Sequence, residues 1–329
     1  MKKRLLITSI VMMLVVAVAL STATYAWFTS NTQVTANHVI LTAATMEGDA
    51  LLISHAGDNT DLSQEINLVT NGDYRLYPAT PNSESTFTST IAQSGFMNLE
   101  VDGSNTAKST NISNPNKSYY TDTFYIYNKG FTPVTITPTV SIYYNADNGA
   151  SYDAARSVRV AIIEKVGTAV SSSSVTLGSA VLKNIYEFDD SATATEAVYS
   201  HPDSFVAGMT YYSDDAGTAY SGETITASNF AANKASLYIL TGNKCTAKNG
   251  ALGTYGASTT DDPATANSAY TNAGITYTAA NYTAIAAPAS GTYVANQYTI
   301  VVWLEGWDAQ CTNAMSAGLF RIGVTFQKA

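Results

Sequence analysis

The sequence predicts an all-β protein, a jelly-roll-like antiparallel β-sandwich with long polar insertions, preceded by a signal peptide. Three observations predict it. Short apolar segments alternate with stretches rich in Gly, Asn, Asp and Pro, and no sustained apolar stripe at helical period follows the first thirty residues. Of the 329 residues, 12% are charged and 46% are hydrophobic, so the chain can bury a substantial core and disorder is excluded as its class.

The amino-terminal residues predict export. Residues 2–4 are basic, Leu5–Leu20 carries no charge, and small residues then lead to Ala26. This order is typical of a secretory signal peptide, here residues 1–26. The alternative is an uncleaved membrane anchor, because Leu5–Phe28 is long enough to span a bilayer. We expect a secreted protein, extracellular or at the cell surface, that contacts the membrane through this segment before cleavage.

The charge balance limits the partners. The chain has 25 acidic and 16 basic residues, for a formal net charge of -9, and cleavage would remove three of the basic ones. Nucleic acid is excluded as a partner, because contacts with phosphates need clustered Lys and Arg.

The clearest strand pattern lies in residues 117–144. Apolar and polar side chains alternate there on both sides of Asn128-Lys129-Gly130, which predicts two antiparallel strands joined by a short loop. Pro133 and Pro138 predict that the second strand lies at an edge or carries a bulge. Further strands are expected in seven segments: His38–Met46, Ala50–His55, Phe96–Val101, Val158–Val166, Val181–Phe188, Tyr298–Trp307 and Gly318–Gln327. Polar insertions are expected near residues 191–223 and 246–297 of a sandwich domain that spans residues 37–329.

Two blocks of the sequence point to a known family. The first is Thr24–Phe28 (TYAWF), with apolar Val39–Ala43 beyond it, and the second is Ser118–Gly130. Together they resemble the TasA/camelysin family of fibre-forming proteins exported by Gram-positive bacteria. The resemblance implies a jelly-roll subunit that polymerises head to tail into extracellular fibres or a biofilm matrix. It also implies that the segment freed by signal cleavage adds as a strand to the next subunit.

The donor segment in this sequence is expected within residues 27–36. Phe28 and Val34 would share one face of the strand and Trp27 the other, so that the two aromatic residues could anchor it. The physical basis is independent of the family, since an extended peptide can satisfy the open backbone groups of a sheet edge. Two alternatives stay open, namely that this segment is the chain's own first strand or a disordered terminus.

No catalytic residues are expected. The sequence has no HExxH and no GxSxG motif, and its three histidines lie far apart. The alternative function is a monomeric adhesin or carbohydrate-binding module, with Trp303 and Trp307 as a stacking platform for sugar rings. Burial of both tryptophans in the core is the more ordinary arrangement.

The chain contains two cysteines, Cys245 and Cys311, which could form one disulfide after export or remain as buried thiols. No cofactor is expected. Acidic pairs at residues 189–190, 214–215 and 261–262 could contribute to calcium sites, but none has the spacing of an EF-hand loop, so calcium stays unassigned.

Overall fold

The computed structural model of the protein describes residues 34–43, 51–58, 60–63, 65–67, 74–81, 85–91, 95–97, 100–101, 107–108, 118–145, 148–169, 174–189, 195–249, 280–290, 292–306, 311 and 318–329. The expected signal peptide, Trp27, Phe28 and Trp307 lie outside these ranges. Within them, no helix combines the length and the apolar character that a membrane crossing requires.

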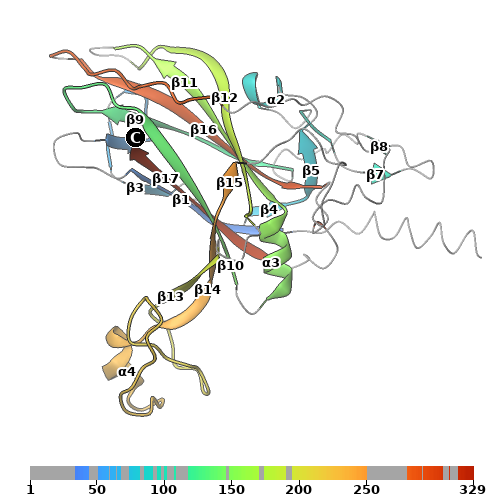
Figure 1. The fold of residues 1–329 in the computed structure, drawn as a ribbon, viewed down its shortest axis with the longest axis vertical. Coiled ribbons are helices and arrows are strands. Elements are labelled where there is room, and N and C mark those ends of the chain that lie inside the picture. Colours follow the sequence, from blue (N-terminus) through green and yellow to red (C-terminus); the bar gives the residue numbers. More distant parts are fainter. Residues whose placement is uncertain are drawn as a thin grey trace, which may run out of the picture.

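The structure confirms an all-β sandwich built from two main sheets (Figure 1). Sheet 1 has the order β13-β14-β10-β17-β1-β3, with β4 also beside β1. Its strands are β1 (Val34–Ala43), β3 (Glu65–Asn67), β4 (Tyr74–Leu76), β10 (Ile136–Tyr144), β13 (Thr195–Ser200), β14 (Ile239–Thr246) and β17 (Leu319–Lys328).

Sheet 2 has the order β15-β12-β11-β16-β5-β6, with β9 beside β16 and β2 beside β9. Its strands are β2 (Leu51–Ser54), β5 (Pro78–Pro81), β6 (Phe96–Met97), β9 (Tyr120–Asn128), β11 (Val158–Gly167), β12 (Leu177–Glu187), β15 (Lys248–Asn249) and β16 (Val294–Glu305). A separate pair joins β7 (Glu100–Val101) and β8 (Ala107–Lys108). The helices are short: α2 (Ser85–Thr88), α3 (Gly149–Arg156), α4 (Phe230–Asn233) and the 3-10 turn η3 (Lys234–Ser236).

The main core lies between the two sheets. Alternate residues of β10, from Ile136 to Tyr144, are buried, and they pack in one cluster with residues of β9, β11, β16 and β17. The aromatic rings of Phe124, Tyr298 and Phe326 pack against one another within it at centroid distances of 5.5–6.0 Å. Each buried side chain of this size contributes about 1.5–3 kcal/mol through its removal from water.

The predicted pairing of β9 with β10 is wrong. β9 pairs with β16 and β2 in sheet 2, whereas β10 pairs with β17 and β14 in sheet 1. The turn between them therefore crosses from one sheet to the other, and Val134 within it bridges to Ile285. Alternation in the sequence reports that one face of each strand is buried, and it looks the same for a hairpin and for two strands that face each other across a sandwich.

The prediction that a proline marks a sheet edge is confirmed at Pro138. Pro138 is paired with Phe326 of β17, but the register of β10 with β14 covers Ser141–Tyr144. Among the described strands, β10 is thus an edge at Pro138, where a residue without an N–H group breaks no ladder.

Residues 195–246 form an arm that projects from the sandwich (Figure 1). β13 and β14 pair with each other, and the tip holds α4 and η3. The base of the arm belongs to sheet 1, because Asn243–Thr246 of β14 pair with β10 and Cys245 lies in the main core. The arm has its own small core, in which Phe205 and Tyr211 pack on Phe230 at ring distances of 6.1 Å and 6.3 Å. The polar insertion expected near residues 191–223 is therefore the first part of a longer structured unit.

The long strands define two ends of the sandwich. At the distal end lie the β9–β10 turn and the carboxy terminus, where the Ala329 N–H donates to the Thr135 carbonyl at 2.9 Å. At the arm end lie α3, the arm, and the start of both β1 and β17. The pairing of β10 with β17 runs from Ile136–Lys328 at the distal end to Tyr144–Phe320 at the arm end.

Candidate functional site

The chain's first described strand, β1, lies inside sheet 1. It is parallel to β17, from Thr35–Leu319 to Ala43–Phe326, and antiparallel to β3 and β4 on its other side. Apart from β16 with β5, the other pairings that the structure describes are antiparallel. β1 does not pair with the next strand that the structure describes, because that strand, β2, belongs to sheet 2. β1 is therefore inserted into the sheet and is not one arm of a hairpin.

The position of Val34 narrows the donor candidate. Val34 pairs with Leu76 in the chain's own sheet, and Thr35 and Ala36 pair with Leu319 and Phe320. The last three residues of the expected donor segment 27–36 thus belong to the sandwich. The part that stays a donor candidate is residues 27–33, and the chain enters the sandwich at the arm end.

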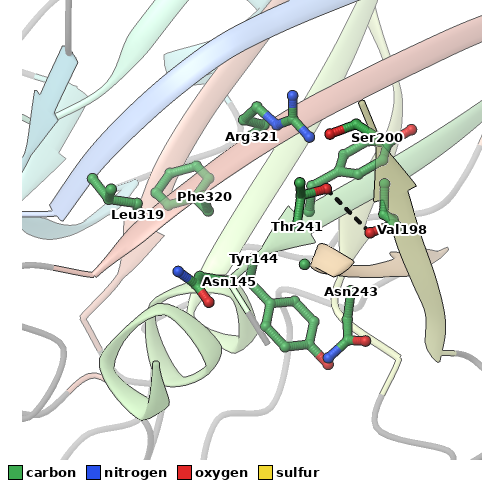
Figure 2. A pocket seen from close by; sticks show the side chains of 11 residues that line it. Tyr144, Asn145, Val198, Ser200, Thr241, Asn243, Leu319, Phe320 and Arg321 are labelled. Carbon is green, nitrogen blue, oxygen red and sulfur yellow. Dashed lines mark hydrogen bonds between the residues drawn. The ribbon is translucent and has the colours of Figure 1, made fainter. Parts of the chain in front are cut away.

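A cleft of about 340 Å³ lies where the arm leaves the sandwich. Figure 2 shows how side chains from four strands surround it. Its lining comes from the end of β10, the start of β17, the second half of β13 and the middle of β14: Tyr143, Tyr144, Asn145, Val198, Ser200, Thr241, Gly242, Asn243, Leu319, Phe320 and Arg321. We call it the arm cleft.

Local backbone features shape the arm cleft. A Cβ atom at Gly242 would collide with the carbonyl oxygen of Tyr144, so glycine lets β14 approach the end of β10. The register of β13 with β14 shifts between Val198 and Tyr199, which is the signature of a bulge and bends the strand. The Thr241 hydroxyl donates to the Val198 carbonyl at 3.1 Å and holds the two strands together at this point (Figure 2).

The chemistry of the arm cleft favours binding over reaction. The Arg321 guanidinium lies over the Tyr143 ring, 5.2 Å from its centroid, and gives the cleft a cationic aromatic wall. Hydroxyl and amide groups of Ser200, Thr241 and Asn243 add donors and acceptors. These are groups that hold an aromatic or polar ligand in place.

A buried polar network joins sheet 2 to the segment that precedes β16. The Lys183 ammonium lies 2.7 Å from the Glu164 carboxylate, and these side chains are 5% and 1% exposed. Glu164 also accepts from the Tyr298 hydroxyl at 3.0 Å and from the Thr283 N–H at 3.2 Å. Burial, and then the Glu164 carboxylate, raise the pKa of Tyr298 well above its ordinary value. Because protein groups already provide the hydrogen-bond and ionic partners of the Glu164 carboxylate, we interpret this network as structural.

The alternative in which Trp303 forms part of an exposed stacking platform is wrong, and burial in the core, the more ordinary arrangement, is confirmed for this residue. Trp303 is fully buried, with its ring 5.6 Å from Phe87 and 6.1 Å from Phe96. Its indole N–H donates to the Glu305 carboxylate at 3.0 Å. Phe87 of α2, with residues of the strands β5 and β6 at the end of sheet 2, packs on the outer face of β11, β12 and β16. β16 is therefore buried on both faces, and its tryptophan belongs to a second core cluster. Trp307 lies outside the described residues.

The two cysteines are thiols in the structure. Cys245 is buried, and its sulfur donates to the Asp189 carbonyl at 3.3 Å. Cys311 is partly buried and packs against the same core cluster. The disulfide between them stays a prediction.

The expected calcium ligands are placed in part. Asp214 caps a turn, since its carboxylate accepts the Thr218 N–H at 2.8 Å, and hydrogen bonds from Thr218 lower the pKa of Asp214. Residues 190, 261 and 262 lie outside the described ranges. In the part of the chain that the structure describes, no three His, Cys, Asp or Glu side chains gather where they could hold a metal ion.

Sequence reasoning missed the arm cleft. Its wall residues Tyr143, Thr241 and Arg321 come from three separate parts of the chain, and no local motif connects them. No family model, curated protein or solved structure matches this chain.

Proposed function

We propose that the protein is a secreted structural subunit that polymerises into extracellular fibres or a surface matrix. Each subunit adds the strand-forming segment that precedes Val34 to its neighbour. The observation that carries this proposal is the insertion of β1 beside β17 in parallel orientation, without a hairpin. β1 itself pairs within its own chain and begins at the arm end, so the residues before Val34 are the ones available to pair with the sheet edge of another copy.

The energetics of such a contact come from the backbone. A strand edge presents a row of N–H and C=O groups, and an extended peptide that pairs with it satisfies them in register. The contact joins different surfaces of the two copies, so it does not close on itself and it propagates as a filament. Trp27 and Phe28 would supply the apolar anchors of the added strand.

Negative-stain microscopy of purified chains tests the proposal. The chain from Trp27 to Ala329 should form filaments, and the same chain without residues 27–33 should remain monomeric. The deletion stops before Val34 because β1 begins there, so circular dichroism should show both chains folded. A matched control replaces residues 29–33 with glycine and serine while keeping Trp27 and Phe28, which separates the anchors from the length. Filaments from the deleted chain would refute the strand-addition mechanism.

The arm cleft favours a second candidate, a monomeric adhesin or carbohydrate-binding module. Its stacked Arg321 and Tyr143 form the wall that a sugar ring would contact, in place of the predicted tryptophans. Binding on a glycan array that is lost in a Tyr143→Ala variant would support this candidate.

A further inference from the structure

We infer that Phe131 of one copy docks into the arm cleft of the next copy and sets the head-to-tail direction of the polymer. The inference deepens the proposed function and rests on it, since it names the surfaces that meet when two subunits join. Three observations carry it: an exposed aromatic tip, a cleft that fits it, and their position at opposite ends of the sandwich.

Phe131 is presented to solvent on a well-supported turn. Its side chain is 93% exposed, the highest value among the large hydrophobic residues that the structure describes. The fully buried Asn128 holds the turn, because its amide donates to the Thr132 carbonyl at 2.7 Å and its side-chain oxygen accepts the Gly130 N–H at 2.8 Å. A partner that covers this exposed phenyl ring removes it from water, and this burial lowers the free energy of the complex.

The arm cleft has the size and lining for this ring. A cavity of about 150 Å³ is enough to bind benzene, and the arm cleft measures about 340 Å³, which leaves room for neighbouring residues of the turn. Leu319, 41% exposed, lines it and offers an apolar contact. The guanidinium of Arg321, already stacked on Tyr143, can also face a second aromatic ring.

The placement of the two features makes the occupant a second copy. β10 runs from the Phe131 turn to Tyr143, and its nine residues separate the two by about 30 Å. Phe131 therefore cannot reach the arm cleft of its own chain. A tip at one end that fits a cleft at the other end gives a heterologous contact, which propagates in one direction. The same contact brings the amino terminus of one subunit to the distal end of its neighbour.

The first experiment compares Phe131→Ser with Val206→Ser in the chain from Trp27 to Ala329. Val206 is a matched control, because it is 48% exposed and lies outside the arm cleft, on the arm. We expect Phe131→Ser to raise the critical concentration for filament growth by about tenfold or more, as the loss of an interface anchor does. We expect Val206→Ser to leave it unchanged. Both chains should show the unfolding curve of the unsubstituted protein, since exposed positions contribute little to stability.

The second experiment is a mixing test. Thr241→Trp fills the arm cleft with a side chain from its own lining and leaves Phe131 intact. The Thr241→Trp and Phe131→Ser variants, each alone, should remain monomeric at concentrations where the unsubstituted chain polymerises. An equal mixture should form dimers in analytical ultracentrifugation, because the intact Phe131 of one variant fits the intact cleft of the other and both remaining ends are blocked.

The outcomes separate this inference from the proposed function. Filaments from Phe131→Ser at the normal critical concentration, or a mixture that stays monomeric, would overturn the docking of Phe131. Loss of filaments on deletion of residues 27–33 would still support strand addition in that case. Conversely, filaments that survive the deletion but not Phe131→Ser would retain the docking contact and refute strand addition.

Discussion

The ion pair of Glu164 and Lys183 holds two parts of the fold together. The pair is buried, and neither charge would be stable there without the other. Lys183 also donates to the Asn281 carbonyl at 2.7 Å, and Glu164 accepts from the Thr283 N–H. The pair therefore fixes residues 281–283 against sheet 2 and closes the core beside β16.

Replacing Lys183 with methionine should destabilise the protein by about 3–5 kcal/mol, because it leaves the Glu164 carboxylate buried without its counter-charge. The double variant Lys183→Met, Glu164→Gln should recover much of this loss, since it removes both charges and keeps an acceptor oxygen. Urea unfolding followed by circular dichroism measures both values. A single variant within about 0.5 kcal/mol of the unsubstituted chain would show that the pair is not structural.

The raised pKa of Tyr298 makes a prediction for alkaline pH. The fold favours the neutral phenol, because burial and the Glu164 carboxylate both oppose its ionisation. The contribution of the neutral Tyr298 phenol to the free energy of unfolding is fully present below the ordinary tyrosine pKa of about 10. It is lost as the pH rises from there through the higher pKa of the folded state. The free energy of unfolding of Tyr298→Phe should thus be lower at pH 8 but should fall less steeply between pH 10 and 11. Equal slopes for the two chains would contradict this assignment.

At the scale of elements, burial explains which predictions succeeded. Both strands around Asn128 were predicted. β10 buries alternate residues, as its sequence pattern indicates, whereas the second half of β9 is buried on both faces, with Ile126 and Tyr127 in different core clusters. The predicted pairing of these two strands with each other was wrong, because the turn between them crosses from sheet 2 to sheet 1. β16 carries a nearly continuous run of buried residues, which its apolar sequence is consistent with, but the cover on its outer face comes from distant α2, β5 and β6.

The arm should be separable from the sandwich. Ser200 and Ile239 are the last paired residues of β13 and β14, so an Asn-Gly turn between them would close a two-residue hairpin in place of residues 201–238. None of the described residues 201–238 belongs to the three core clusters of the sandwich. We expect the shortened chain to unfold cooperatively in urea with a free energy within about 1 kcal/mol of the full chain. Loss of cooperative unfolding would show that the arm supports the sandwich.

At the scale of the whole molecule, the sequence predicted the class of fold and much of its strand content. Turn residues and alternation were sufficient for the all-β sandwich, because both reflect local chemistry. The arm cleft could not be predicted, since Tyr143 and Arg321 meet through the pairing of β10 with β17. The position of β1 could not be predicted either, because its parallel partner β17 is about 280 residues away in the sequence.

The neighbourhood of β1 and β17 has a consequence for the order of folding. Thr35 pairs with Leu319, so β1, the first described strand, can take its place in sheet 1 only after β17, the last described strand, has been made. A chain made from its amino terminus cannot form this pairing until residues 319–328 have been synthesised, and contacts of such long sequence separation form slowly. Sheet 1 therefore stays incomplete in the nascent protein until β17 is available to pair with β10 and β1.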